Sequence, residues 1–148
     1  MGPMHAALEL ARAAGNAGDV PVGAVVLNPH GVVIGEGRNR REVDGDPTAH
    51  AEVLAMRAAA QARGRWRLED CTLVVTLEPC LMCAGAILAA RIPRIVIGAW
   101  DAKAGATGSQ WDVVRDARIG SKVEVISGVL EHECGRVLTD FFEARRGE

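Results

Sequence analysis

The sequence predicts an α/β fold in which helices cover both faces of one mixed, five-stranded β-sheet. Segments with helical spacing of apolar residues alternate with short β-rich runs, in the order α-β-β-α-β-α-β-β-α. Strands separated by helices favour parallel crossovers, whereas two strands joined by a tight turn must be antiparallel. The 148 residues, 49% of them hydrophobic, are enough for one core without disulfides. We therefore expect residues 1–148 to form a single domain.

The first elements are a helix and a hairpin. Apolar residues recur at helical spacing from Met4 to Ala14, and Gly15 follows them. Residues 22–27 and 32–36 are β-rich runs on either side of the turn cluster Asn-Pro-His-Gly at 28–31. This pattern predicts two antiparallel strands directly after the first helix.

A polar loop over residues 38–47 leads to the second predicted helix. Thr48 has a hydroxyl that can cap a helix running to about Arg63, where Gly64 ends it. We therefore expect this helix to begin close to His50.

The second half of the chain alternates strands and helices. Residues 72–77, 94–99 and 123–126 are short β-rich runs. Pro79 precedes a predicted helix over residues 81–90, and residues 103–109 form a glycine-rich loop. The last helix is predicted from an apolar stripe at Leu130, Cys134, Val137, Leu138 and Phe141.

Charge and hydropathy exclude several classes of protein. The net charge of −2 gives no overall attraction for nucleic acid, although a local basic patch remains compatible with it. No uncharged stretch reaches the ~18 residues of a membrane span, so we expect no membrane insertion. Glu9 and Arg12 interrupt the only apolar pattern that could resemble a secretion signal, which predicts a cytoplasmic protein.

Four residues at two predicted helix starts suggest a metal site. Cys80 and Cys83 are three positions apart on a first helical turn, so both sulfurs can reach one ion. A helix N-terminus favours the thiolate form that zinc requires. Two thiolates and the imidazole of His50 suit Zn²⁺, and no fourth protein ligand is evident. Three ligands predict an open, catalytic zinc site with Glu52 as the base beside it.

Spacing alone leaves the convergence of these residues open. Positions two apart diverge around a helix, so His50 and Glu52 meet at one site only near the helix end. The competing interpretations are a buried histidine with core cysteines, and a redox-active Cys-x-x-Cys pair. Cys71 and Cys134 fit the description of small buried hydrophobic residues, and we assign them no chemistry.

The order His-x-Glu followed by Pro-Cys-x-x-Cys resembles the zinc-dependent cytidine/deoxycytidylate deaminase superfamily. The resemblance to its bacterial tRNA-specific adenosine deaminase family extends over nearly the whole chain. It is carried by residues 19–25 (DVPVGAV), 46–52 (DPTAHAE), 76–86 (TLEPCLMCAGA), 101–106 (DAKAGA) and 140–142 (DFF).

The resemblance implies a cytidine-deaminase-like, three-layer α/β/α sandwich, a homodimer and one Zn²⁺ per subunit. It implies hydrolytic deamination of adenosine to inosine at the wobble position of a tRNA anticodon stem-loop, that of an arginine isoacceptor. Glu52 would move the protons, and His50, Cys80 and Cys83 would hold the metal. By the same resemblance, substrate contacts fall to Asn39, Ala51, Asp101, Lys103, Phe142 and Arg146.

Other functions remain compatible with the sequence. A deaminase of free guanine or cytosine, or of their nucleosides, would keep the zinc chemistry without the polymer, and an inactive zinc module could bind RNA or protein. Two sets of arginines could contact phosphate or simply face solvent, and Phe142 could stack on a base or extend the core. The arginines are Arg63, Arg65 and Arg67 in one set and Arg145 and Arg146 in the other.

Overall fold

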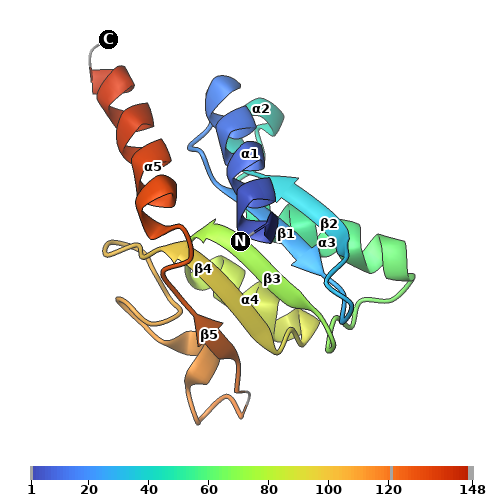
Figure 1. Ribbon diagram of the computed structural model, residues 1–148. Helices are drawn as coiled ribbons and strands as arrows, with labels where there is room; N and C mark the ends of the chain where they lie inside the picture. The colour runs from blue at the N-terminus through green and yellow to red at the C-terminus, as the bar shows by residue number, and fades with distance from the viewer. Residues whose placement is uncertain (1, 121, 147–148) are drawn as a thin grey trace.

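A computed structural model describes residues 2–120 and 122–146 and shows a five-stranded sheet at the centre of the molecule (Figure 1). The strand order is β2-β1-β3-β4-β5. β1 pairs antiparallel with both β2 and β3, whereas β3, β4 and β5 run parallel. The sheet is therefore mixed, as predicted. The strands are β1 (Gly23–Leu27), β2 (Val33–Arg38), β3 (Thr72–Leu77), β4 (Arg94–Ala99) and β5 (Glu124–Ile126).

Helices lie on both faces of this sheet, which confirms the predicted three layers (Figure 1). Alternate residues of β1 belong to different cores, because successive strand side chains point to opposite faces. Ala24 and Val26 pack with the face covered by α3 and α4, and Val25 packs with the face covered by α1 and α5. The helices are α1 (Gly2–Asn16), α3 (Ala51–Arg63), α4 (Leu81–Ala90) and α5 (Glu131–Arg146).

Helix α3 lies unusually close to β2. A Cβ atom at Gly35 would collide with the carbonyl oxygen of Ala55, and one at Gly37 would collide with that of Ala51. Glycine in the strand and alanine in the helix together allow this close approach. The packing fixes the beginning of α3 beside the sheet, and this is where His50 lies.

The predicted cap of α3 is wrong. Thr48 does not cap α3, since both its backbone N–H and its hydroxyl donate to Oδ1 of Asp46, at 2.9 and 2.8 Å. His50 is the N-cap residue instead, with an extended backbone. The side chain of Thr48 therefore hydrogen-bonds in a short turn formed by Asp46 and not to the first turn of α3.

The polar loop also contains a one-turn helix that the sequence did not predict. Helix α2 (Arg41–Asp44) is too short for apolar periodicity to reveal. The buried carboxylate of Asp19 accepts hydrogen bonds from the backbone N–H groups of Glu42 at 2.8 Å and Val43 at 3.3 Å. The first turn of α2 is therefore stabilised by a residue from a distant part of the chain. A 3-10 turn at Val113–Arg115 likewise has no apolar pattern.

None of the helices in the described residues is both long enough and apolar enough to span a bilayer.

Candidate metal centre and active-site pocket

The structure brings His50, Cys80 and Cys83 together. Nδ1 of His50 lies 3.6 Å from Sγ of Cys80 and 3.4 Å from Sγ of Cys83. All three ligand atoms lie within 4.8 Å of one another. Zinc bonds of about 2.0 Å to nitrogen and about 2.3 Å to sulfur separate those atoms by about 3.5 Å around a tetrahedral ion. The three side chains therefore fit Zn²⁺, and the prediction of the three ligands' convergence is confirmed.

Two of these residues are helix N-caps. His50 immediately precedes α3, and Cys80 immediately precedes α4, each with an extended backbone. Two helix N-termini, each with a partial positive charge, thus face the cluster and favour thiolate over thiol. As an N-cap, His50 lies outside the regular helix, and this allows its side chain to approach the same pocket as Glu52. The uncertainty left by their two-residue spacing is resolved in this way.

Hydrogen bonds and burial shift the pKa values of the cluster in different directions. A hydrogen bond from Cys83, assisted by one from His50, lowers the pKa of Cys80 to about 3. The hydrogen bond to Cys80 in turn raises the pKa of Cys83, and burial raises it further. The separate hydrogen bond between His50 and Cys80 raises the pKa of His50. These shifts favour a thiolate at Cys80, the form in which cysteine binds zinc.

Glu52 lies in the first turn of α3 and is only 4% exposed. Burial raises the pKa of its carboxyl to about 7, while its own backbone N–H and His50 act in the opposite direction. It lines a cavity of about 180 Å³ together with His50 and Cys80. The other lining residues are Val20, Val22, Asn39, Arg41, Ala51, Leu77, Glu78, Asp101 and Ala104.

Three of the predicted substrate-contacting residues line this cavity, namely Asn39, Ala51 and Asp101. The amide of Asn39 also has structural bonds, since Nδ2 donates to the carbonyl of Val20 at 3.1 Å and Oδ1 accepts from the N–H of Arg41 at 3.2 Å. Its side chain is therefore held in one orientation at the pocket wall.

A second hollow of about 460 Å³ shares Val20, Asn39 and Arg41 with the first cavity. Phe142, which is 46% exposed, lines this hollow. Arg145 lines it too, whereas the predicted contacts Lys103 and Arg146 line neither hollow. The second hollow therefore adjoins the active-site cavity and reaches the C-terminal part of α5.

Sequence reasoning missed Arg41 and Glu78 in the pocket. Arg41 lies in the polar loop, where nothing in its neighbours distinguishes it from a solvated arginine. Glu78 carried a signal, because it is a carboxylate that directly follows an apolar strand and precedes the Pro-Cys pair. It is only 2% exposed, and an acidic residue is seldom buried without partners.

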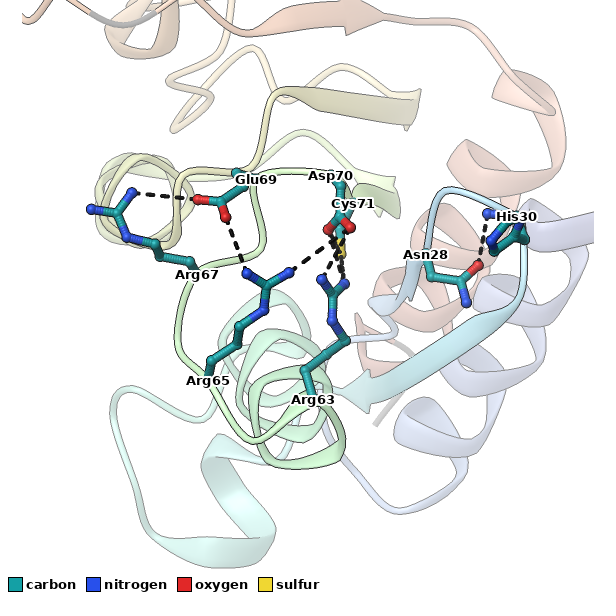
Figure 2. A network of polar contacts seen from close by, with 8 residues as sticks. All are labelled: Asn28, His30, Arg63, Arg65, Arg67, Glu69, Asp70 and Cys71. Carbon is teal, nitrogen blue, oxygen red and sulfur yellow. Dashed lines mark hydrogen bonds and ion pairs between the residues drawn. The ribbon is translucent and has the colours of Figure 1, made fainter.

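The arginines at 63, 65 and 67 are already paired within the chain (Figure 2). Arg63 forms a bidentate pair with Asp70, at 2.9 and 3.0 Å, and also contacts Sγ of buried Cys71 at 3.1 Å. Arg65 and Arg67 both bond to Glu69, at 3.2 and 3.4 Å. Two carboxylates therefore pair with the three guanidinium groups, so most of the positive charge of this set is already balanced within the chain.

A larger hollow, of about 630 Å³, contains none of the zinc ligands. It is lined by the first residues of the parallel strands, Thr72, Arg94 and Glu124, whereas the zinc cluster follows the carboxyl end of β3. Ligands in open α/β sheets bind at the carboxyl ends of strands. The zinc ligands and the position at the carboxyl end of β3 therefore both indicate that the smaller cavity is the active site.

Comparison with known proteins identifies the family. Residues 3–99 match the cytidine and deoxycytidylate deaminase zinc-binding region. The tRNA-specific adenosine deaminase of Haemophilus influenzae is 50% identical over 145 residues, covering 98% of this chain and 84% of that protein. The chain belongs to the tRNA-specific adenosine deaminase family.

Solved structures agree with this membership. A structure from studies of A-to-I editing by tRNA:A34 deaminases at the wobble position superposes with a TM-score of 0.89 at 42% identity, covering 93% of this chain and 99% of that chain. The guanine deaminase of Bacillus subtilis has a TM-score of 0.66 at 32% identity, covering 99% and 93% of the two chains. The fold is therefore cytidine-deaminase-like, and the His50, Cys80 and Cys83 cluster of this deaminase is the family's zinc-binding site.

Proposed function

We infer that this deaminase hydrolyses adenosine to inosine at the wobble position of tRNA. The observation that carries this conclusion is the open cluster of His50, Cys80 and Cys83 with buried Glu52 beside it, in a chain that is 50% identical to a tRNA-specific adenosine deaminase. Three protein ligands leave one position for water, as in catalytic rather than structural zinc sites.

The residues of the pocket divide the reaction between them. Zn²⁺, when bound, lowers the pKa of a water molecule toward neutrality. Glu52 accepts a proton from the attacking water, whose oxygen forms a bond to C6 of the adenine. Glu52 passes this proton to the ring nitrogen, then takes the second proton from the oxygen now bonded to C6 and passes it to the amino group, and the C6–N bond breaks to release ammonia. Water and adenosine are consumed, and inosine and ammonia are formed.

The hollow next to the active site suits the nucleotides that flank the target. Phe142 offers an exposed ring for stacking, and Arg41 and Arg145 offer guanidinium groups that can meet phosphates. We further propose that Asn39 and Ala51 contact the target nucleoside. Asp101, Lys103 and Arg146 are proposed to meet the flanking nucleotides of an anticodon stem-loop.

The direct test of function is incubation with an arginine tRNA that carries adenosine at the wobble position. We expect inosine at that position alone, measured by sequencing the reverse transcript, in which dC is inserted opposite inosine, so that the wobble adenosine is read as G. The matched control is the same tRNA with guanosine at the wobble position, which should stay unchanged. Absence of inosine from the first tRNA would contradict the proposed substrate.

A free-base deaminase is the second candidate, favoured by the 32% identity to a guanine deaminase. It predicts ammonia release from guanine, cytosine or their nucleosides and no reaction with tRNA. A panel of free bases and nucleosides, assayed for ammonia beside the tRNA, separates the two functions. Zinc binding with no turnover of any substrate would indicate an inactive zinc module.

We also propose that the deaminase is a homodimer through the α4 face. Helix α4 has no charged residue, yet it exposes Leu81, Met82 and Ala89 to solvent. Trp66, 56% exposed, lines an adjoining hollow of about 310 Å³ with Ala89. An exposed apolar surface of this kind is typical of a protein interface.

Sedimentation tests this interface. Ala89→Glu places a charge on the α4 face and should shift the protein from dimer to monomer, because an unpaired carboxylate is costly to bury. Ala144→Glu, at an exposed position on α5, should leave the dimer intact. A wild-type monomer, or an unchanged dimer in Ala89→Glu, would refute the proposed face. We propose a cytoplasmic location as well, since reducing conditions keep the zinc-binding thiols free.

A further inference from the structure

Glu78 is a buried carboxylate to which the mechanism assigns no role. It follows the last residue of β3 and precedes Pro79 and the zinc ligand Cys80. It is 2% exposed, and in the described residues no arginine, lysine or histidine forms an ion pair with it. Burial of a carboxylate without a counter-ion is costly unless hydrogen bonds replace its hydration.

Those hydrogen bonds come from one segment, residues 101–109. Oε1 of Glu78 accepts from the backbone N–H of Asp101 at 2.9 Å. Oε2 accepts from the N–H groups of Thr107 at 3.1 Å and Ser109 at 3.0 Å. Hydrogen bonds to an ionised acceptor are stronger than those between neutral groups. One side chain thus holds both ends of a nine-residue segment.

The middle of the segment fits closely against the same carboxylate. Gly105 forms an isolated antiparallel bridge with Cys80, and the N–H of Ala106 donates to the carbonyl of Pro79 at 2.9 Å. A Cβ atom at Gly105 would collide with the carboxylate of Glu78. Only glycine therefore permits this approach.

Asp101 is also held by hydrogen bonds from within the segment. Its carbonyl accepts from the N–H of Gly105 at 2.9 Å and from the hydroxyl of Ser109 at 2.8 Å. Its Oδ1 accepts from the N–H groups of Lys103 at 3.0 Å and Ala104 at 3.1 Å. Asp101 and Ala104 both line the active-site cavity, so the segment forms one of its walls.

We propose that Glu78 is a positioning residue that holds the 101–109 segment as the wall of the substrate pocket. The hydrogen bonds of Asp101 shape the segment internally, whereas its bonds to Glu78 and to the carbonyl of Pro79 attach it to the end of β3. The Glu78 carboxylate links the 101–109 segment to the stretch of chain that carries Cys80. The metal centre and the pocket wall therefore keep a fixed position relative to each other. This proposal rests on the proposed function, because the wall is expected to meet nucleotides of the tRNA.

The test is Glu78→Gln in the full-length zinc enzyme. The amide keeps one acceptor oxygen and replaces the other with an N–H₂ group, which faces a backbone N–H that it cannot accept from. We expect KM for an anticodon stem-loop to rise about tenfold, because the loss of one charge-assisted hydrogen bond has an effect of about this size. The value of kcat should change by less than about threefold. Zinc content should remain at the wild-type value.

Amide hydrogen exchange supplies a readout that does not depend on activity. In Glu78→Gln, exchange should accelerate in peptides covering residues 101–109 and stay unchanged in those covering β1 and β3. Gly105→Ala should reproduce both effects, since its methyl group displaces the carboxylate without altering it. The matched control is Glu69→Gln, which changes an exposed acid paired with Arg65 and Arg67 and should behave as wild type.

The outcomes are distinguishable. Unchanged exchange over 101–109, or an unchanged KM in Glu78→Gln, would overturn the positioning role. Faster exchange throughout the chain with loss of zinc would also overturn it, because Glu78 would then support the fold as a whole. Failure of the wild-type protein to act on tRNA would refute the proposed function, while the exchange and zinc measurements would still report on the segment.

Discussion

Glu52→Gln should lower kcat by about 10³-fold or more while zinc content stays at the wild-type value. General acid–base catalysis contributes about 10²–10⁴-fold, and this carboxylate is proposed to transfer several protons in one turnover. Glutamine has the same shape and can still hydrogen bond, but it neither accepts nor returns a proton at neutral pH. Glu52 is 4% exposed, so a neutral amide removes a buried acid without leaving a cavity.

Single-turnover inosine formation together with metal analysis checks this prediction. Glu52→Ala is the second variant, and it should be as inactive as Glu52→Gln although it opens space beside the metal ligands. Activity within tenfold of wild type in either variant would contradict the mechanism. Loss of zinc from both would instead place Glu52 among the groups that hold the metal.

Cys80→Ser and Cys83→Ser should each lose both zinc and activity. The ligand set has only three members, so each substitution removes a third of the protein ligands and one of two negative charges. We expect zinc affinity to fall by more than the ~100-fold that accompanies loss of a group merely supporting a ligand. Inductively coupled plasma mass spectrometry on dialysed protein measures the remaining metal.

Cys71→Ser is the matched control for these two variants. Cys71 is also buried, but it contacts Arg63 and Asp70 at the far end of α3, so the serine should retain zinc and activity. Chelation of the wild-type enzyme should abolish turnover, and added Zn²⁺ should restore it. Wild-type zinc content in Cys80→Ser or Cys83→Ser would show that the ion is bound elsewhere.

Strong local patterns allowed the main elements to be predicted. The stripe from Met4 to Ala14 and the run at residues 72–77 became α1 and β3, because their hydrophobic spacing matches the period of the structure they form. The hairpin turn forms at the Asn-Pro-His-Gly cluster, where Asn28 Oδ1 accepts from two backbone N–H groups. Such signals lie within a few residues of one another and need no distant partner.

Helix α2 was missed because a distant residue decides the local structure there. Helix α2 is stabilised by Asp19, more than twenty residues away in the chain. For the arginines at 63, 65 and 67, the sequence left phosphate contact and a solvated face both open, and the structure shows that they pair with Glu69 and Asp70. Sequence alone does not reveal which charges are already neutralised.

The order of residues by itself determined the metal chemistry of this protein. Two cysteines three positions apart, a histidine and a carboxylate at helix starts define a zinc ligand set and a base through residue type and short-range spacing. Only the tertiary structure decided that His50, Cys80 and Glu52 face one cavity, that Glu52 is buried there, and that Glu78 bonds to the segment that forms one wall. The physical reason is that ligand chemistry belongs to individual side chains, whereas burial and enclosure are created when segments fifty residues apart pack together.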